Sequence, residues 1–322
     1  MKTRGLNTAA RGELRRMLGN QVCFDEPMAR HTRFRIGGPA DALAEPQDEA
    51  QLAALLAWTS RHGMPYTVIG GGTNLLVRDG GIRGVTIRLT HLAARAAWQV
   101  EAQRVRVAAD AGLPTRRLCA LALREGWQGL NFALGIPGCL GGAIQMNAGT
   151  SLGSMADVLE MVSVMTGEGR IIEVQRTELD CGYRRLRLPG RLCRDVARPA
   201  IILSARLHLT PGDRDRLRIQ ARELVLARKR RQPGGQHGAG CFFRNPSPEQ
   251  PAGRLIDAAG FKGRCAGDAQ VSPLHANFIV NRGRAQAADV LALAERIKTA
   301  VSGQFGIQLE AEVRIVGDDR DA

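Results

Sequence analysis

The 322-residue chain has few aromatic side chains and lacks any long apolar run. Phenylalanine, tryptophan and tyrosine make up 4% of it, and no segment approaches the ~20 consecutive apolar residues of a membrane-spanning helix. The N-terminal stretch MKTRGLNTAARGELRRMLGN also lacks the apolar core and small-residue cleavage site of a secretory signal. We therefore expect a cytoplasmic protein without a membrane partner.

Paired cysteine motifs are missing as well. Seven cysteines are scattered along the chain, and no two of them form a C-x-x-C pair. An odd and scattered set excludes a regular disulfide framework and a zinc ribbon, so it predicts reduced thiols and no metal site. The cysteines are Cys23, Cys119, Cys139, Cys181, Cys193, Cys241 and Cys265.

Acidic residues are outnumbered, with 31 Asp and Glu against 45 Lys and Arg, which gives a net charge of +14. Because the arginines are spread along the chain and no nucleic-acid motif accompanies them, we expect no nucleic-acid partner. An anionic small ligand and ordinary solvated surfaces explain the charge equally well. The length exceeds that of a usual single core, so two or three domains are expected.

The apolar pattern predicts an α+β chain with a strand-rich front and a smaller back of helices and strands. In the front we expect strands flanking a glycine loop within 65–77, a strand at 105–112, a helix at 113–126, a hairpin at 158–174 and a buried strand at 199–210. In the back we expect helices at 211–233, 253–260 and 287–305 and strands at 275–281 and 307–317. The long helix that begins near residue 211 indicates a domain boundary there.

Two glycine clusters in the front half have the composition of phosphate-binding loops. Gly70, Gly71 and Gly72 precede Thr73, and GIPGCLGGAIQMNAG spans residues 135–149. Without side chains in the way, the backbone N–H groups of such loops can approach a phosphate closely. The first cluster continues into a strand rather than a helix, which excludes the classical Rossmann fingerprint. Each cluster alone is better explained as tight turns, whereas the two together suggest one extended pyrophosphate ligand.

Eight blocks of sequence stand out between about residue 32 and residue 317. They are TRFRIGGPA (32–40), VIGGGTNLLVRDGGIRGVTI (68–87), LGIPGCLGGAIQMNAG (134–149), CGYR (181–184), GAGCFFRNP (238–246), LIDAAGFKG (255–263), VSPLHANFIVNRG (271–283) and LEAEVRIVG (309–317). In this order, these blocks resemble the UDP-N-acetylenolpyruvoylglucosamine reductase family, FAD enzymes of bacterial peptidoglycan synthesis. The short spacing between CGYR and the C-terminal blocks is similar to that of the shorter subclass, which lacks a substrate-clamping insertion.

The resemblance implies a fold and a reaction. After an N-terminal segment at 1–30, it implies a vanillyl-alcohol-oxidase-like (PCMH-type) FAD-binding domain of two lobes at 31–210 and a smaller α+β substrate-binding domain at 211–322. In the family, NADPH reduces FAD, and flavin N5 passes a hydride to C3 of UDP-N-acetylglucosamine enolpyruvate. Protonation of C2 then gives UDP-N-acetylmuramate. The expected partners are this nucleotide sugar and NADPH, and we expect a monomer or weak oligomer.

The resemblance also assigns binding residues. Those expected at FAD are Gly70, Gly71, Gly72, Thr73, Asn74, Leu75, Ile136, Pro137, Gly138, Gly141, Gly142, Ala143 and Asn147. Those expected at the substrate are Tyr183, Asn245, Lys262, His275 and Arg314.

Two of the expected catalytic residues carry charge. Hydride addition to an enol ether builds negative charge on C2 and its carboxylate, so the site needs a fixed cation. The family has an arginine directly after the tyrosine of CGYR, here Arg184, whose planar fork suits a carboxylate. The residues that follow, RLRL, depart from the family pattern and leave the local packing open. Glu312 matches the family's second acid, although Glu310 would share its face on a strand, so periodicity does not choose between them.

The third expected catalytic residue is Cys241, which replaces the serine that most family members use as general acid. A thiol, with a pKa of ~8.5, is a far stronger acid than an aliphatic hydroxyl. Cys241 can therefore deliver the proton to C2 with less help from its surroundings. Nearby cations that lowered its pKa would leave a thiolate with no proton to give, so both forms stay open. Without the resemblance, a buried cysteine with no chemical role is the ordinary interpretation.

Two other functions stay open. An FAD-dependent sugar or hydroxyacid oxidase would share the front half, but it is not expected to combine GCFFRNP with LEAEV. A nucleotide-sugar-binding protein that has lost catalysis would explain the serine-to-cysteine change, but the presence of Arg184 and Glu312 argues against it.

Overall fold

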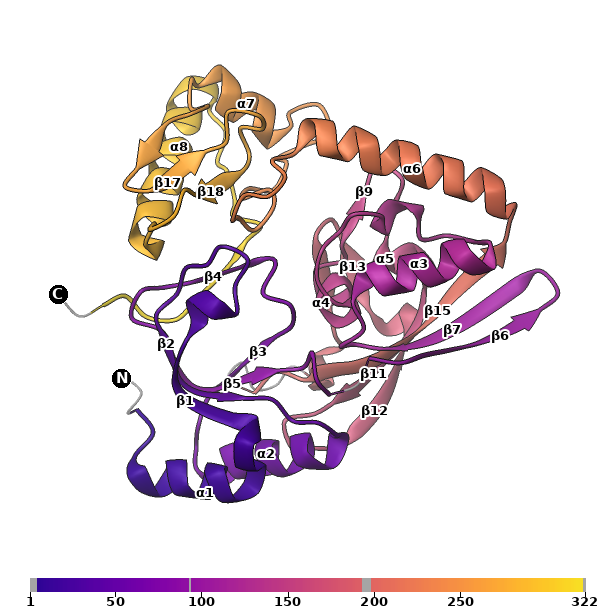
Figure 1. The fold of residues 1–322 in the computed structure, drawn as a ribbon, viewed down its shortest axis with the longest axis vertical. Coiled ribbons are helices and arrows are strands. Elements are labelled where there is room, and N and C mark those ends of the chain that lie inside the picture. Colours follow the sequence, from indigo (N-terminus) through magenta and orange to yellow (C-terminus); the bar gives the residue numbers. More distant parts are fainter. Residues whose placement is uncertain (1–4, 93, 193–197, 321–322) are drawn as a thin grey trace. The chain divides into compact units, whose positions relative to one another are not determined.

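A computed structural model describes residues 5–92, 94–192 and 198–320 (Figure 1). Their contacts form two compact units that interleave along the chain. The first unit comprises Met1–Phe24, Ala42–Gly71 and Gly84–Leu226, and the second comprises Asp25–Asp41, Gly72–Arg83 and Ala227–Ala322. The units differ from the domains expected at 31–210 and 211–322 because two early segments fold with the C-terminal part. The division into an FAD-binding domain and a substrate-binding domain at these boundaries stays a prediction.

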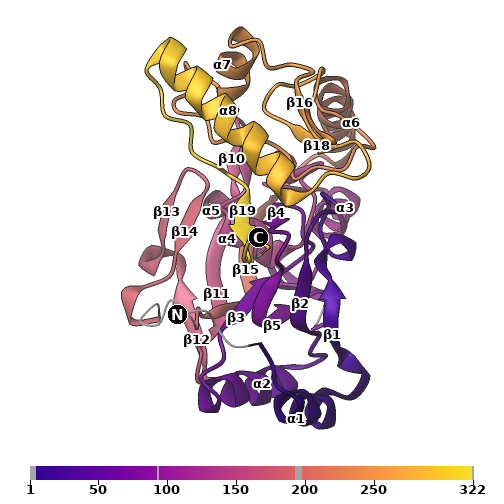
Figure 2. The same ribbon diagram turned by 90° about the vertical axis from the view of Figure 1, so that its left-hand side faces the viewer.

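One lobe of the first unit is built on helices α1 (Thr8–Leu18) and α2 (Glu49–Arg61), which lie side by side in both views (Figures 1 and 2). Each begins at a side-chain cap, since Asn7 accepts from the Ala10 N–H and Asp48 from the Gln51 N–H. The lobe also contains most of a four-stranded sheet in the order β1-β2-β5-β3, with β3 and β5 parallel. The strands are β1 (Val22–Pro27), β2 (Pro39–Ala44), β3 (Tyr66–Ile69) and β5 (Ile82–Arg88).

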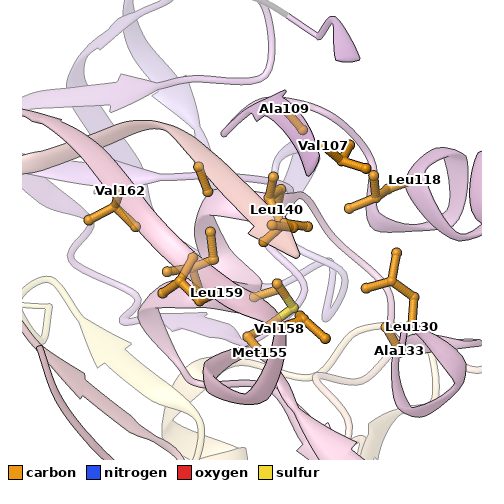
Figure 3. Packing of buried hydrophobic residues seen from close by; sticks show 14 of the residues in the cluster. Val107, Ala109, Leu118, Leu130, Ala133, Leu140, Met155, Val158, Leu159 and Val162 are labelled. Carbon is orange, nitrogen blue, oxygen red and sulfur yellow. The ribbon is translucent and has the colours of Figure 1, made fainter. Parts of the chain in front are cut away.

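The other lobe is a sheet in the order β12-β11-β15-β7-β6, with the short β8 paired to β15. Figure 3 shows Val107, Leu118, Leu140 and Val162 among the apolar side chains that meet between this sheet and its helices. The strands are β6 (Ala96–Glu101), β7 (Arg104–Asp110), β8 (Trp127–Gln128), β11 (Leu159–Met165), β12 (Ile171–Gln175) and β15 (Ile201–Pro211), and the helices are α3 (Thr115–Glu125), α4 (Leu140–Gln145) and α5 (Met155–Val158). A small hairpin joins β9 (Gly149–Thr150) and β10 (Gly153–Ser154).

Local predictions in this lobe are confirmed. The helix expected at 113–126 is α3, and it ends where Gly126 adopts a left-handed φ of 75°, which glycine tolerates without strain. The hairpin expected at 158–174 is the antiparallel pair β11 and β12. The long helix expected at 211–233 is α6 (Arg214–Arg231), whose first turn is capped by Asp213.

The second unit combines helices α7 (Ala252–Ala258) and α8 (Ala287–Phe305) with short strands. Strands β16 (Cys265–Ala266), β17 (Ala269–Val271) and β18 (Ile279–Asn281) form one sheet, and β4 (Leu75–Val77) pairs in parallel with β19 (Arg314–Val316). The strand expected at 307–317 is therefore wrong before residue 314. The segment around Ala311 bonds to the chain near Phe243 as an isolated bridge, because no further residues align there.

The amino terminus of α8 receives a carboxylate from a distant loop. Asp79 Oδ1 and Oδ2 accept hydrogen bonds from the backbone N–H groups of Ala287 and Ala288, at 2.8 and 2.9 Å. These N–H groups have no partner inside the helix, and a negative charge is favourable beside them. The contact therefore ties the loop after β4 to the longest helix of the second unit.

We expect Asp79→Ala to lower the free energy of unfolding by about 1–2 kcal/mol, because two helix N–H groups lose their acceptor. Urea unfolding followed by circular dichroism measures the change. The matched control is Asp319→Ala, whose exposed ion pair with Arg78 is expected to contribute less than about 1 kcal/mol. Equal losses in the two variants would contradict the capping role.

Two general properties concern the described ranges only. Within them no helix combines the length and apolar character needed to cross a membrane. The six cysteines in these ranges are free thiols, as predicted, whereas Cys193 lies outside the described residues.

Candidate active site

The two glycine clusters contact each other in the first unit. Gly70 follows β3 and Cys139 precedes α4, and a Cβ atom added to Gly70 would lie 2.5 Å from Cys139 Sγ. No real side chain tolerates that distance, so the close approach of the loops depends on glycine at this position. Gly71 and Gly142, one from each cluster, are exposed. The contact therefore brings together two glycine loops with accessible backbone.

Backbone hydrogen bonds fix the second cluster against the start of α3. Leu140 N–H donates to Leu113 O, and Gly141 N–H donates to Ala111 O, both at 2.9 Å. Gly141 is held so closely that a Cβ atom would lie 2.8 Å from Ala111 Cβ. The buried hydroxyl of Thr115, whose N–H donates to Gly138 O, has no hydrogen-bond partner in the described protein. A pre-formed glycine loop with an unsatisfied hydroxyl behind it fits a phosphate-bearing cofactor.

The remaining residues expected at FAD differ in exposure. Leu75 and Ala143 are buried, which leaves mainly their backbone groups for a ligand, whereas Thr73 and Ile136 are half-buried. Gly72 has a left-handed φ of 60° and accepts a hydrogen bond from Arg33 N–H at 2.9 Å. Pro137 is exposed. Contact of these residues with FAD stays a prediction.

Asn147 connects the second glycine cluster to the CGYR segment. Its Nδ2 donates to Gly182 O and its Oδ1 accepts from Ala156 N–H, both at 2.9 Å. The residue is buried, and its φ of 42° is one that asparagine adopts more readily than most side chains. Gly182 lies two residues before Arg184. The structure thus gives Asn147 a role in positioning the CGYR segment that the sequence did not indicate.

Arg184 lies in a tight hairpin turn. Strands β13 (Asp180–Gly182) and β14 (Arg185–Arg187) are antiparallel, so Tyr183 and Arg184 form the two-residue connection. Arg184 has a left-handed φ of 52°, and its guanidinium carbon lies 5.1 Å from the centre of the Tyr183 ring. It is half-buried, whereas its neighbour Arg185 is exposed and pairs with Asp180 at 3.0 Å.

The packing after the CGYR motif, which the sequence left open, is now explained. Leu186 is 3% exposed and belongs to the apolar core of the lobe, while Arg185 and Arg187 on either side are exposed. This alternation is that of a half-buried strand, so RLRL anchors the hairpin even though it departs from the family pattern.

Cys241 and Glu312 lie on neighbouring backbone segments of the second unit. Cys241 is half-buried and forms an isolated bridge with Phe278, and the buried Phe242 and Phe243 follow it. Glu312 N–H donates to Phe242 O at 2.8 Å. Two of the three predicted catalytic residues therefore lie on backbone segments that are hydrogen-bonded to each other at Phe242, the residue after Cys241.

Glu312 and Glu310 differ in their exposure to solvent. The Glu310 side chain is 75% exposed and faces Arg244 at 3.5 Å, whereas Glu312 is half-buried. Because this segment is not part of a regular strand, the argument that both carboxylates share one face does not apply. Burial favours Glu312 as the residue that acts in a site.

Two asparagine side chains hold the backbone beside Cys241 and at Glu312. The sequence did not indicate this positioning role for either of them. Asn277 is 3% exposed and bonds to both backbone groups of Phe243. Asn74, expected at FAD, donates from Nδ2 to Glu312 O at 3.1 Å. Asn277 lies inside the HANF block, in which the resemblance assigns a role only to His275.

His275 is predicted to bind substrate, and its environment limits how. Its Nδ1 accepts from Asn277 N–H at 3.2 Å, and its ring packs edge-on against Phe278. Burial lowers the pKa of His275, which keeps the ring neutral at neutral pH. With Nδ1 accepting, the proton lies on Nε2, so His275 can offer a neutral hydrogen-bond donor rather than a charge.

The other residues expected at the substrate already make contacts within the protein. Asn245 Oδ1 accepts from Ala252 N–H and so caps α7, and Lys262 pairs with Asp257 at 2.7 Å. Arg314 opens β19, and Tyr183, in the first unit, is 54% exposed. Their contact with substrate stays a prediction.

We expect Gly70→Ala to reduce the amount of flavin that copurifies with the protein, because the added Cβ forces the two glycine loops apart. A new methyl group in a tight contact costs about 1–3 kcal/mol. The double variant Gly70→Ala with Cys139→Ala removes the obstructing sulfur and should restore flavin binding. Absorbance of bound flavin per protein measures both. A double variant as defective as the single one would show that this contact does not decide the fit.

Comparisons with known proteins cover nearly the whole chain. Residues 40–175 match the family described as FAD binding domain, and residues 232–316 match the C-terminal domain of UDP-N-acetylenolpyruvoylglucosamine reductase. The chain is 45% identical to the UDP-N-acetylenolpyruvoylglucosamine reductase of Geobacter metallireducens, over 98% of this chain and 100% of that one. It is 42% identical to the enzyme of the same name from Desulfosudis oleivorans, over 92% and 95%.

A solved structure agrees with these matches. The crystal structure of UDP-N-acetylenolpyruvylglucosamine reductase from Thermus caldophilus superimposes with a TM-score of 0.73 at 36% identity, and the match covers 91% of this chain and 97% of that one. The α+β fold with an FAD-binding domain, expected from the sequence, is confirmed.

Proposed function

The chain belongs to the UDP-N-acetylenolpyruvoylglucosamine reductase family of FAD-containing oxidoreductases, and from this premise we propose that it reduces the enolpyruvyl ether of UDP-N-acetylglucosamine with NADPH. The product is UDP-N-acetylmuramate, a precursor of peptidoglycan. The supporting observation is that Cys241 and Glu312, the two residues expected from the family to handle the proton, lie on backbone segments joined by the hydrogen bond from Glu312 N–H to Phe242 O.

The glycine loops around Gly70 and Cys139 are the residues that would hold FAD in the first unit. When bound and reduced, FAD supplies the hydride that adds to C3 of the enolpyruvyl group. The half-buried Arg184 faces the substrate carboxylate in this proposal. Its guanidinium stabilises the negative charge that spreads from C2 onto the carboxylate as the carbon–carbon double bond is lost.

Cys241 completes the reaction by protonating C2. Its S–H bond breaks, the proton forms the new C–H bond at C2, and the thiolate regains a proton from solvent. Glu312, held one hydrogen bond away through Phe242, assists this protonation or polarises the substrate. Tyr183, Asn245, Lys262, His275 and Arg314 are proposed to bind the uridine diphosphate, with His275 acting as a neutral donor.

We propose the cellular location, oligomeric state and metal requirement of the enzyme on the same basis. It acts in the cytoplasm on small molecules, as a monomer or weak oligomer, and without a metal ion. The assignment to the shorter subclass and the domain division at residue 211 belong to the same proposal.

The test is to incubate the purified protein with NADPH and the enolpyruvyl ether and to identify the product by mass spectrometry. The proposal predicts the reduced lactyl ether, formed in proportion to the NADPH consumed and without uptake of oxygen. Oxygen uptake with a simple sugar or hydroxyacid, and no reduction of the enolpyruvyl ether, would instead identify an oxidase.

A further inference from the structure

The side chain of Asn277 holds both backbone groups of one residue. Its Oδ1 accepts from Phe243 N–H at 2.9 Å, and its Nδ2 donates to Phe243 O at 2.8 Å. Its own carbonyl accepts from Phe242 N–H at 2.7 Å. These contacts fix the two residues that directly follow Cys241, and none of them reaches solvent, since Asn277 is 3% exposed.

The same arrangement continues to the second predicted acid. Phe242 O accepts from Glu312 N–H at 2.8 Å, and Glu312 O accepts from Asn74 Nδ2 at 3.1 Å. Asn74 O in turn accepts from Arg314 N–H at 3.1 Å. Asn277 thus lies at one end of a series of hydrogen bonds that runs through Phe243 and Phe242, the residues after Cys241, to Glu312 and Asn74.

An amide is the side chain that this position requires. It offers one acceptor and N–H donors in a fixed plane, which matches the N–H and C=O groups of a single residue. Alanine or leucine would leave both groups of Phe243 buried without a partner, and that is costly. A well-packed apolar residue would serve a purely space-filling role at this degree of burial.

We propose that Asn277 is a positioning residue for the reaction: its amide holds the 241–243 segment so that the Cys241 thiol stands where C2 needs a proton. This rests on the proposed function. A displacement of about 1 Å in a catalytic group can cost about 10²-fold in rate. Among the described residues, the segment pairs with its neighbours only through the isolated bridges Cys241–Phe278 and Phe243–Ala311, and the Asn277 side chain adds hydrogen bonds to both backbone groups of Phe243.

Asn281 provides a matched control in the same unit. It is 5% exposed, and within the described part of the chain its side chain also hydrogen-bonds to backbone groups, namely Phe34 O, Gly283 N–H and Ala285 N–H. These contacts leave the 241–243 segment untouched. Asn277→Ala and Asn281→Ala therefore both lose buried hydrogen bonds, but only the first releases Cys241.

The first experiment compares half-reactions of the flavin-loaded proteins under anaerobic conditions. Both variants should be reduced by NADPH at nearly the wild-type rate. On addition of the enolpyruvyl ether, flavin in Asn277→Ala should reoxidise about 10²-fold more slowly than in Asn281→Ala. Reoxidation rates of the two variants that agree within about threefold would overturn the proposal.

The second experiment does not depend on turnover. Iodoacetamide labels the thiols, and peptide mass spectrometry gives the labelling rate of Cys241 relative to the half-buried Cys265 as reference. Release of the segment should change this ratio about tenfold in Asn277→Ala and leave it unchanged in Asn281→Ala. An unchanged ratio in both variants overturns the proposal. If the wild-type protein does not act on the enolpyruvyl ether, the proposed function fails and this ratio alone decides whether Asn277 positions Cys241.

Asn277→Asp keeps the experiment informative if the alanine variant does not fold. A protonated aspartic acid has one acceptor and one donor and restores both bonds, whereas its carboxylate loses the bond to Phe243 O. Burial raises the pKa of such a carboxyl, so the bonds are present at low pH and are lost as the pH rises through that value. Reoxidation relative to wild type should therefore recover as the pH falls, and a ratio that does not change with pH contradicts the positioning role.

Discussion

Cys241→Ala is expected to slow reoxidation of the reduced flavin by the enolpyruvyl ether by about 10²–10⁴-fold, the usual contribution of a general acid. Reduction of the flavin by NADPH should be unaffected, because that half-reaction needs no proton at C2. Stopped-flow absorbance at the oxidised flavin band measures both steps. The separation matters, since a loss in both steps would indicate damage to the FAD-binding loops rather than loss of a proton donor.

Two controls define the result. Cys241→Ser introduces the hydroxyl of most family members and should retain activity well above that of alanine. Cys265→Ala removes a thiol of similar exposure in the same unit, and this variant should reoxidise like wild type. Among the described residues the Cys265 sulfur donates a hydrogen bond to Gly263 O and accepts one from Arg282. Wild-type reoxidation in Cys241→Ala would exclude the thiol as the proton donor.

Arg184→Ala is expected to lower the rate of reoxidation by about 10²–10³-fold, the loss seen when one fixed group that stabilises a developing oxyanion is removed. Arg184→Lys keeps the charge without the planar fork and should lie between alanine and wild type. The reoxidation rate at saturating substrate is the measurement.

The neighbouring Arg185 is the matched control for Arg184. It has the same side chain one residue later, but it is exposed and pairs with Asp180 at the surface. Arg185→Ala should therefore change the rate by less than about threefold, since exposed ion pairs contribute little. Equal losses in both variants would point to the charge of the hairpin as a whole rather than to Arg184.

Elements set by local patterns were predictable from the sequence. The apolar spacing and glycine stop of residues 113–126 gave α3, and the turn Gly-Glu-Gly between alternating runs gave β11 and β12. The glycine clusters and the blocks around Cys241 and Arg184 indicated the candidate site through their resemblance to a family. In each of these the information lies within a few residues of the feature.

The positioning contacts were not predictable, because they join residues far apart in sequence. Asp79 caps α8 across 208 positions, and Asn74 holds Glu312 across 238. No pattern in either segment reveals such a partner. The strand expected at 307–317 is confirmed only at residues 314–316, because the earlier part lies beside the segment around Phe243, which is a loop rather than a strand. For the same reason the two compact units cross the domain boundary expected near residue 211.

The most direct test of the central claim is an anaerobic single turnover of the wild-type protein. The bound flavin is reduced with NADPH, excess nucleotide is removed, and the enolpyruvyl ether of UDP-N-acetylglucosamine is added while the oxidised flavin band is followed. We expect the band to return fully, with one lactyl ether formed for each flavin. A flavin that stays reduced until oxygen is admitted would contradict it.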